Sequence, residues 1–158
     1  MLTRSQVKAA QKQALEMLDR AGIKLTPEER ENLEVADLGL NDLEQTGLEI
    51  VTYINTNIYC AKENVLFPYQ TCPEHRHPPI SSRQGKMETF RVRSGVVYLY
   101  VEGEPVETIK ARVPKGSESY YTVKHEIELH PGEQFTIPPN TFHWYQSGPE
   151  GAIVSEFS

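Results

Sequence analysis

The chain has 158 residues, 16 of them basic and 22 acidic, which gives a formal charge of −6 at neutral pH. This length fits one domain that buries about two-thirds of its unfolded surface, enough for one sizeable core. The acidic balance argues against a nucleic-acid partner, because proteins that bind nucleic acids carry basic patches. No apolar run approaches 18 residues, so we predict no membrane span.

The first residues, MLTRSQVKAAQKQ, contain no apolar stretch of the kind found in secretory signals. We therefore expect a cytoplasmic protein, in which Cys60 and Cys72 stay reduced.

Two helices are predicted near the N-terminus, within an extension of residues 1–36. The first spans 3–21, because Thr3 and Gln6 have capping-box spacing and Gly22 is a natural C-terminal stop. Its apolar stripe consists of Ala10, Ala14, Leu15, Leu18 and Ala21. The second starts at Thr26-Pro27-Glu28-Glu29 and ends near Leu33. We expect these helices to cover one face of the domain, with a dimer contact as the alternative.

Short strands are predicted from residue 48 to the end of the chain. Their ranges are 49–55, 57–62, 65–69, 89–93, 96–102, 119–123, 126–129, 134–137, 143–146 and 152–157, separated by glycine- and proline-rich turns. Many short strands with no helices between them are typical of an antiparallel sandwich or barrel. The sequence therefore predicts a single all-β domain over 1–158, with a β-barrel at 48–158.

Four side chains are candidate ligands of a metal ion. His75 and His77 form an HxH pair, whose rings face the same way on a strand because side chains alternate. Glu88 shares its face with apolar residues, where a lone carboxylate is costly to bury unless a cation satisfies it. His143 follows a proline-rich turn. A zinc site that uses Cys72 and His75 is an alternative, and His125 and His130 read as surface residues.

The spacing of these residues resembles the two motifs of the cupins, a family with a double-stranded β-helix or jelly-roll barrel. Glu88 and Gly95 are separated by six residues, and Gly132, Pro138-Pro139-Asn140 and His143 follow the second motif with Asn in place of Gly. The sequence departs from the usual pattern in two places. Ten residues separate His77 from Glu88, and Tyr69 stands where a glycine is usual.

Over nearly the whole chain the sequence is similar to D-lyxose ketol-isomerases, which are cupin sugar isomerases. The resemblance rests on HRHPP, Gly-Lys-x-Glu-Thr-Phe, Pro-Pro-Asn-Thr-Phe-His-Trp and the terminal Val-Ser-Glu-Phe-Ser. It implies interconversion of D-lyxose and D-xylulose, with D-mannose and D-fructose as a further pair. It also implies that His75, His77, Glu88 and His143 bind a divalent metal, commonly Mn²⁺. Lys62 then faces the substrate, and Glu156 transfers protons.

The chemistry of aldose–ketose isomerisation agrees with these residue types. Moving a proton between C1 and C2 through a cis-enediol needs a Lewis acid, a general base and a positive charge near the enediolate oxygen. Mixed imidazole and carboxylate ligation suits Mn²⁺, Fe²⁺, Co²⁺ or Zn²⁺, and their affinity order does not select one. Trp144, which has the opposite parity to His143, either lines a sugar pocket or packs in the core.

Three other functions fit the same motifs. A cupin dioxygenase would use the four ligands for Fe(II), and a non-catalytic cupin would bind a sugar without chemistry. A sugar-phosphate isomerase would need the basic residues Lys110, Arg112, Lys115 and Lys124, which otherwise read as solvated surface. For the assembly we expect a homodimer, or another small oligomer, that pairs through an edge strand.

Overall fold

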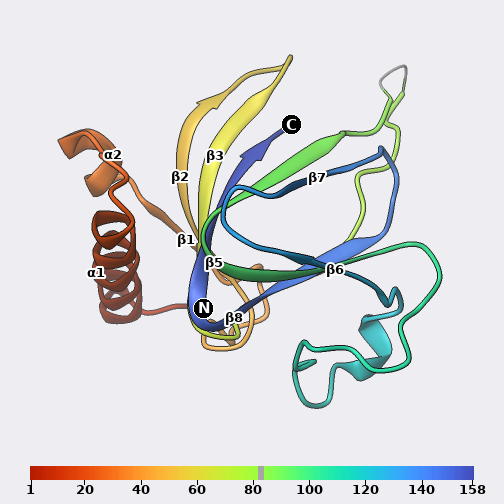
Figure 1. Cartoon of the computed structure of the whole chain (residues 1–158). Helices are drawn as coiled ribbons and strands as arrows, with labels where there is room; N and C mark the ends of the chain where they lie inside the picture. Colours follow the sequence, from red (N-terminus) through yellow and green to blue (C-terminus); the bar gives the residue numbers. More distant parts are fainter. Residues whose placement is uncertain (82–83) are drawn as a thin grey trace.

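A computed structural model describes residues 1–81 and 84–158 of the chain. Within these residues, two α-helices precede eight strands, and one short 3-10 helix lies in a long loop (Figure 1). The helices are α1 (Arg4–Arg20), α2 (Pro27–Glu31) and η1 (Glu118–Tyr120). The strands are β1 (Glu34–Ala36), β2 (Leu48–Asn55), β3 (Cys60–Leu66), β4 (Thr71–His75), β5 (Glu88–Val101), β6 (His125–Leu129), β7 (Gln134–Ile137) and β8 (His143–Phe157).

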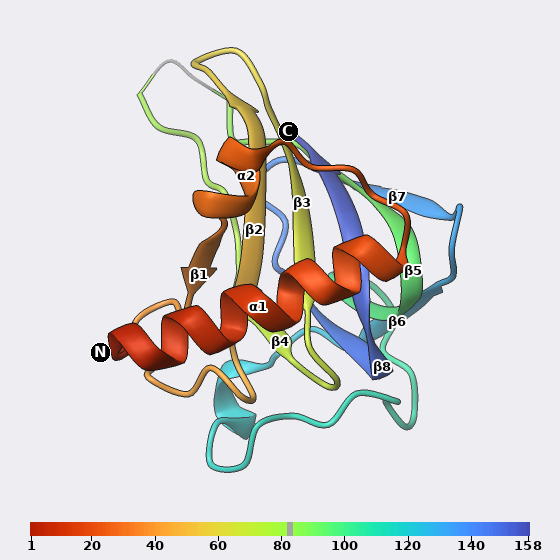
Figure 2. The same ribbon diagram turned by 90° about the vertical axis from the view of Figure 1, so that its left-hand side faces the viewer.

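Helix α1 starts at the predicted capping box and covers one face of the sheet. The Thr3 hydroxyl accepts from the Gln6 amide at 3.3 Å, and the Gln6 side chain accepts from the Thr3 amide at 2.9 Å. The helix crosses β2, β3 and β8 (Figure 2). Its apolar stripe packs on that face in a cluster of Ala14, Met17, Leu18, Ile23, Leu33, Val51, Val65 and Ile153. The helices therefore have the covering role predicted from their apolar faces.

The strands form one antiparallel sheet that folds over on itself. Its order is β1-β2-β3-β8-β5-β6, with β4 paired to β8 and β7 paired to β5. The two longest strands, β5 and β8, lie at the centre and pair with each other along most of their length. In the described part of the chain, β1 and β6 do not pair, so hydrogen bonds do not close the sheet into a complete barrel.

Both long strands bend at one place, which we call the corner: residues 93–96 of β5 and 147–151 of β8. The register shifts there, since Gly95 is opposite Ala152 whereas Val97 is opposite Ser147. Gly95 has φ +75°, and a Cβ at this position would collide with the carbonyl oxygen of Gly151. The corner lets the two halves of the sheet face each other across the main core. That core contains Leu48, Ile50, Leu66, Cys72, Phe90, Val92, Val97, Leu99, Val101, Leu129, Ile137, Tyr145, Ala152 and Val154.

Several predicted strands merge in the structure. The ranges 89–93 and 96–102 belong to β5, and 143–146 and 152–157 belong to β8, because the glycines between them bend the strand rather than end it. The ranges 57–62 and 65–69 were wrong as two strands, since β3 runs unbroken from Cys60 to Leu66. The short strands β1 and β4 lie outside the predicted ranges.

The loop between β5 and β6 contains the one clear error of element type. Residues 119–123 were predicted as a strand, but Glu118–Tyr120 form a 3-10 helix in the long loop that is teal in Figure 1. The loop packs on the face of β8 opposite the main core, where Trp144 stacks on Tyr100 with ring centroids 4.0 Å apart. Trp144 is thus a core residue rather than part of a sugar pocket.

Among the helices of the described residues, none combines the length and the apolar character that crossing a bilayer requires.

Candidate metal centre and active site

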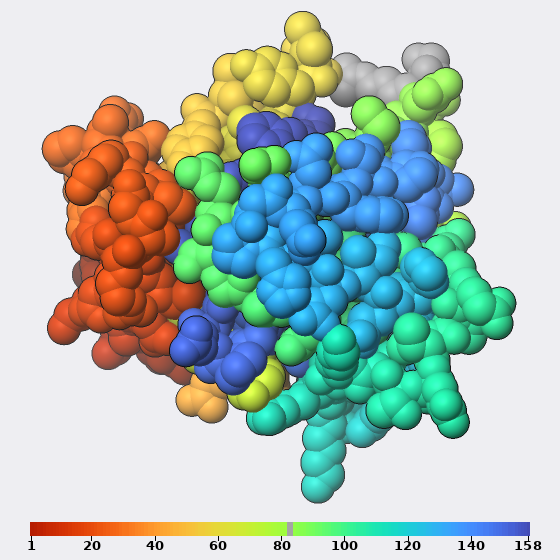
Figure 3. Space-filling model, viewed as in Figure 1, coloured from red at the N-terminus to blue at the C-terminus, as the bar shows by residue number. Residues whose placement is uncertain are grey.

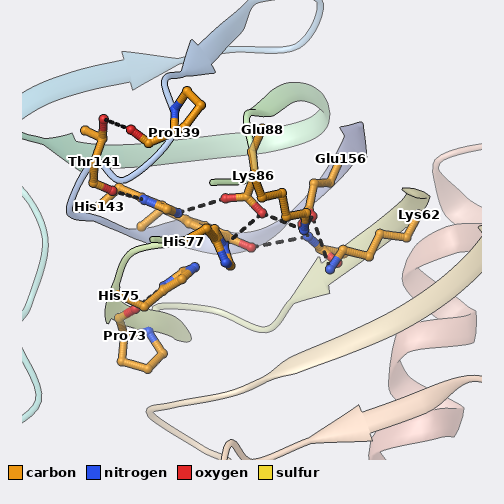
Figure 4. Close-up of polar contacts among 12 residues, drawn as sticks. Lys62, Pro73, His75, His77, Lys86, Glu88, Pro139, Thr141, His143 and Glu156 are labelled. Atoms are coloured by element: carbon orange, nitrogen blue, oxygen red, sulfur yellow. Dashed lines mark hydrogen bonds and ion pairs between the residues drawn. The ribbon is translucent and has the colours of Figure 1, made fainter. Parts of the chain in front are cut away.

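Four predicted ligands converge inside the folded sheet, although they come from distant parts of the chain. Glu88 begins β5, His143 begins β8, and His75 ends β4, with His77 two residues further on. Each offers one ligand atom, and these atoms all lie within 4.8 Å of one another. Figure 4 shows the three rings and the Glu88 carboxylate pointing toward a common centre. His75 and His143 are paired across β4 and β8, which brings their rings to 4.2 Å.

The backbone holds two of the rings in the tautomer that a metal requires. Nδ1 of His75 lies 2.8 Å from the carbonyl oxygen of Pro73, and Nδ1 of His143 lies 2.9 Å from that of Thr141. A carbonyl oxygen only accepts, so each Nδ1 carries the proton and donates it. The lone pair of each Nε2 is therefore free to bind a cation, as is usual for metal-ligating histidines.

The donor atoms of this cluster fit a divalent cation better than they fit one another. Nε2 of His143 lies 3.0 Å from Oε2 of Glu88, and Nε2 of His77 lies 3.2 Å from Oε1. His77 Nε2, His143 Nε2 and Glu88 Oε2 are buried and have no hydrogen-bond partner among residues 1–81 and 84–158. Lone pairs of a neutral imidazole and a carboxylate repel at such distances unless a positive charge lies between them.

The electrostatics of the cluster agree with this interpretation. Burial is the largest cause that lowers the pKa of His75, which favours the neutral ring that binds metals. Burial opposes ionisation of Glu88, but its close contacts with His143 and His77 and the charge of Lys86 outweigh it. The pKa of Glu88 is consequently below its ordinary value.

A second group of charges lies beside this cluster. Oε1 of Glu156 is 3.2 Å from Nζ of Lys62 and 3.2 Å from Nζ of Lys86, and Lys86 also donates to Glu88 at 2.9 Å. Figure 4 shows both lysines reaching the same carboxylate, Lys62 from β3 and Lys86 from the segment before β5. Glu156 is only 3% exposed. The structure thus brings Lys62 and Glu156, both singled out from the sequence, into direct contact.

Sequence reasoning missed Lys86. Its signal was available, because Lys86 precedes Glu88 by two residues and side chains alternate on an extended chain. Burial opposes the charge on Lys86, but the carboxylates of Glu156 and Glu88 outweigh it and raise its pKa. Lys86 therefore stays an ammonium at neutral pH.

A pocket of about 780 Å³ opens beside this group, and Lys62, His77 and Lys86 are among the residues that line it. Its rim comes from the β2–β3 hairpin, the segment after His77 and the C-terminal residue. Figure 3 shows this hairpin (yellow), the segment that follows β4 (green) and the C-terminal residues at one end of the molecule. Ile58, Tyr59, Ile80 and Met87 are exposed on the rim.

The other residues considered from the sequence lie apart from the candidate metal centre. Cys72 is buried and is not part of the four-residue cluster, so the zinc alternative finds no support there. His130 is exposed and His125 half-buried. Among the four basic residues, Lys110 pairs with Glu126 and Glu128, and Arg112 lies over the Tyr69 ring at 3.6 Å.

Two residues other than glycine adopt the left-handed backbone conformation at positions where the cupin pattern has glycine. Asn140 has φ 59° and Tyr69 has φ 60°, and each stands where the family has glycine. Asn adopts this region readily, whereas a bulky residue rarely does. Tyr69 is stabilised there by its contact with Arg112, whose guanidinium also donates to the Tyr69 hydroxyl at 3.0 Å.

A folded antiparallel sheet with three histidines and one glutamate at its interior defines a cupin-type protein with a candidate metal centre.

No protein-family model matches the chain. Two curated relatives match it closely. It is 66% identical over 158 residues to D-lyxose/D-mannose isomerase of Thermosediminibacter oceani, covering all of this chain and 87% of that protein. It is 65% identical over 149 residues to D-lyxose ketol-isomerase of Cohnella laeviribosi, covering 94% of this chain and 82% of that protein. The chain belongs to the D-lyxose ketol-isomerase family of sugar isomerases.

A solved structure confirms the fold prediction. The chain is similar to L-ribose isomerase of Acinetobacter sp. DL28, solved as a variant with L-ribose, with a TM-score of 0.79. The match covers 99% of this chain and 80% of that one at 16% identity. The predicted cupin fold with N-terminal helices is therefore confirmed.

Proposed function

We propose that this enzyme interconverts D-lyxose and D-xylulose, and D-mannose and D-fructose as a second pair. The observation that carries this proposal is the pairing of a candidate metal cluster with an adjacent unligated carboxylate, Glu156, which contacts two lysines that line a pocket. The names of the curated relatives supply the two aldoses, D-lyxose and D-mannose, and the ketoses follow from moving the carbonyl from C1 to C2.

We propose His75, His77, Glu88 and His143 as the ligands of a divalent metal. When bound, the metal supplies Lewis acidity that polarises the carbonyl of the sugar. Nitrogen and oxygen donors suit Mn²⁺, which is our first choice, and also Fe²⁺, Co²⁺ and Zn²⁺. The four side chains are committed to the ion, so another group has to move the carbon-bound proton.

Glu156 is the proposed general base. Its carboxylate removes the proton from C2 of the aldose and returns it to C1, while O1 gains a proton and O2 loses one. Lys62 and Lys86 hold two positive charges beside it, where they stabilise negative charge that develops on the sugar oxygens.

Proton exchange in D₂O tests this function directly. Metal-loaded protein incubated with D-lyxose in D₂O under anaerobic conditions should form D-xylulose with deuterium at C1. NMR measures this incorporation of deuterium. A turnover that requires oxygen would support the dioxygenase alternative, and sugar binding without exchange would support the non-catalytic one.

The Glu156→Gln variant tests the base. The amide keeps the size of the side chain, so metal content should be unchanged while turnover falls about 10²–10⁴-fold, the usual contribution of a general base. Exchange at the parent rate in this variant would mean that the base lies elsewhere. Lys62→Met should also keep the metal and slow turnover.

We further propose that residues 1–158 act as a single domain and that the enzyme is a cytoplasmic homodimer. The free thiols of Cys60 and Cys72 suit a reducing compartment. Light scattering at micromolar concentration should return a mass near twice 18.0 kDa, and a value near 18.0 kDa would exclude the dimer.

A further inference from the structure

Beneath the proposed base lies a buried amide that the sequence analysis did not identify. Asn64 sits on β3 two residues after Lys62, so both side chains point to the inner face of the sheet. Asn64 is fully buried. Its Nδ2 lies 2.8 Å from Oε2 of Glu156 and 3.3 Å from the hydroxyl of Tyr145.

The two oxygens of Glu156 therefore have different surroundings. Oε2 accepts from the neutral Asn64 amide on the interior side, and Oε1 is close to the ammonium groups of Lys62 and Lys86 on the pocket side. Lys62 and Lys86 both line the pocket, whereas Asn64 does not. Oε1 is thus the oxygen that contacts the two pocket-lining lysines, whereas Oε2 contacts a residue of the interior.

The orientation of the amide follows from the chemistry of its neighbours. A carboxylate only accepts, so the NH₂ group of Asn64 has to face it. Oδ1 of Asn64 has no partner among the described residues, and it is buried. An unpaired buried carbonyl costs free energy that a merely structural position would avoid. The NH₂ group of the same amide donates to Glu156, and the need for this donor explains why Oδ1 is left unpaired.

We infer that Asn64 is a positioning residue that fixes the carboxylate of Glu156, so that Oε1 alone exchanges protons with the sugar. The inference rests on the proposed function, since it assigns a partner to the proposed base. An amide neither gains nor loses a proton at neutral pH, so the abstracted proton cannot leave the carboxylate toward the interior. The hydroxyl of Tyr145 accepts from the same NH₂ group and supports this orientation of the amide.

Asn64→Leu tests the inference, because leucine has the same number and branching of side-chain heavy atoms as asparagine and removes the donor. We expect kcat to fall about 10- to 100-fold, which corresponds to the loss of a hydrogen bond to a charged group. KM should stay within about threefold, because the substitution removes no group that binds the sugar equally in the ground state and the transition state. Metal content should be unchanged. Asn64→Ala should show the same pattern and covers the case in which Asn64→Leu does not fold.

The matched control is Gln146→Leu, which removes another buried amide that does not touch Glu156. Its Nε2 donates to Thr71 Oγ1 and to the carbonyl oxygen of Arg112, each at 2.8 Å. We expect a comparable loss of thermal stability with kcat close to the parent value.

A double variant separates positioning from a general structural effect. If Asn64 acts through Glu156, then Asn64→Leu/Glu156→Gln should be no slower than Glu156→Gln alone. Losses that multiply in the double variant, or a parent kcat in Asn64→Leu, would overturn the inference. Parent turnover in Glu156→Gln would instead overturn the proposed base, so the two failures are distinguishable.

Discussion

Two buried carboxylates of this protein, Glu88 and Glu49, have opposite environments. Glu88 is surrounded by histidines and Lys86, which lower its pKa. Glu49 lies on β2 and accepts from Gln70 Nε2 at 3.3 Å, and its Oε2 has no partner within the described residues. Burial raises the pKa of Glu49 to about 8. Glu49 is therefore neutral in the folded protein near pH 7, whereas in the unfolded chain it is ionised.

This difference predicts that stability falls as pH rises. The pKa of Glu49 is higher in the folded state, so folding favours the protonated form, and stability declines between about pH 4.5 and pH 8. Over pH 5.5 to 8 this contribution is on the order of 3 kcal/mol. Glu49→Gln should remove it, giving a flatter pH profile in urea denaturation. Parallel profiles for the parent and Glu49→Gln would contradict the prediction.

At the scale of elements, the loop after β5 is tied to the strands that carry the candidate ligands. Glu74, next to His75, accepts from the Thr122 amide and hydroxyl, each at 2.6 Å, and from the Val123 amide at 3.0 Å. Trp144, next to His143, donates from its indole to the Val123 carbonyl at 2.9 Å. One short segment of the loop thus fastens β4 and β8 from the face opposite the metal cluster.

Removing the charge of Glu74 should loosen this attachment. Glu74→Gln keeps the size of the side chain but replaces one acceptor oxygen with a donor, which leaves amide donors poorly paired. We expect a loss of about 1–3 kcal/mol in the free energy of unfolding, measured in urea. Glu150→Gln, at an exposed position of the corner, is the control and should change stability by less than about 0.5 kcal/mol. Equal effects of the two substitutions would argue against the attachment.

At the scale of the whole molecule, the candidate ligands join three strands that are far apart in sequence. Ligands on β4, β5 and β8 and just after β4 would make a bound metal a cross-link of the fold. A ligand that binds only the folded state stabilises it by about 2.7 kcal/mol at one hundred times its dissociation constant.

Chelation should therefore lower the thermal midpoint of the metal-loaded protein, and adding Mn²⁺ should restore it. His143→Ala should show neither effect, because its Nε2 is one of the ligand atoms of the cluster. Differential scanning fluorimetry measures both, and elemental analysis reports the metal content. A midpoint in the parent protein that does not respond to chelator or to Mn²⁺ would contradict the prediction.

The convergence of the four candidate ligands was predictable because each follows a local rule. HxH spacing, the parity of Glu88 and the turn before His143 are each readable within a few residues. The corner was not predictable in this way. Gly95 and the segment 147–151 look like turns that end strands, and only the pairing of β5 with β8 shows that both strands continue. Asn64 was missed for a related reason, since its partner Glu156 is 92 residues away.

The corner also decides which kinds of sequence change the enzyme tolerates in evolution. In β8, odd-numbered residues such as His143 and Tyr145 face inward before the corner, and even-numbered residues such as Val154 and Glu156 do so after it. A straight strand would separate His143 from Glu156 by about 43 Å. Replacing exposed Pro149 or Glu150 leaves this geometry alone, but inserting or deleting one residue there would turn Glu156 to the outer face. We therefore expect the corner to vary in composition among functional descendants while its length is inherited unchanged.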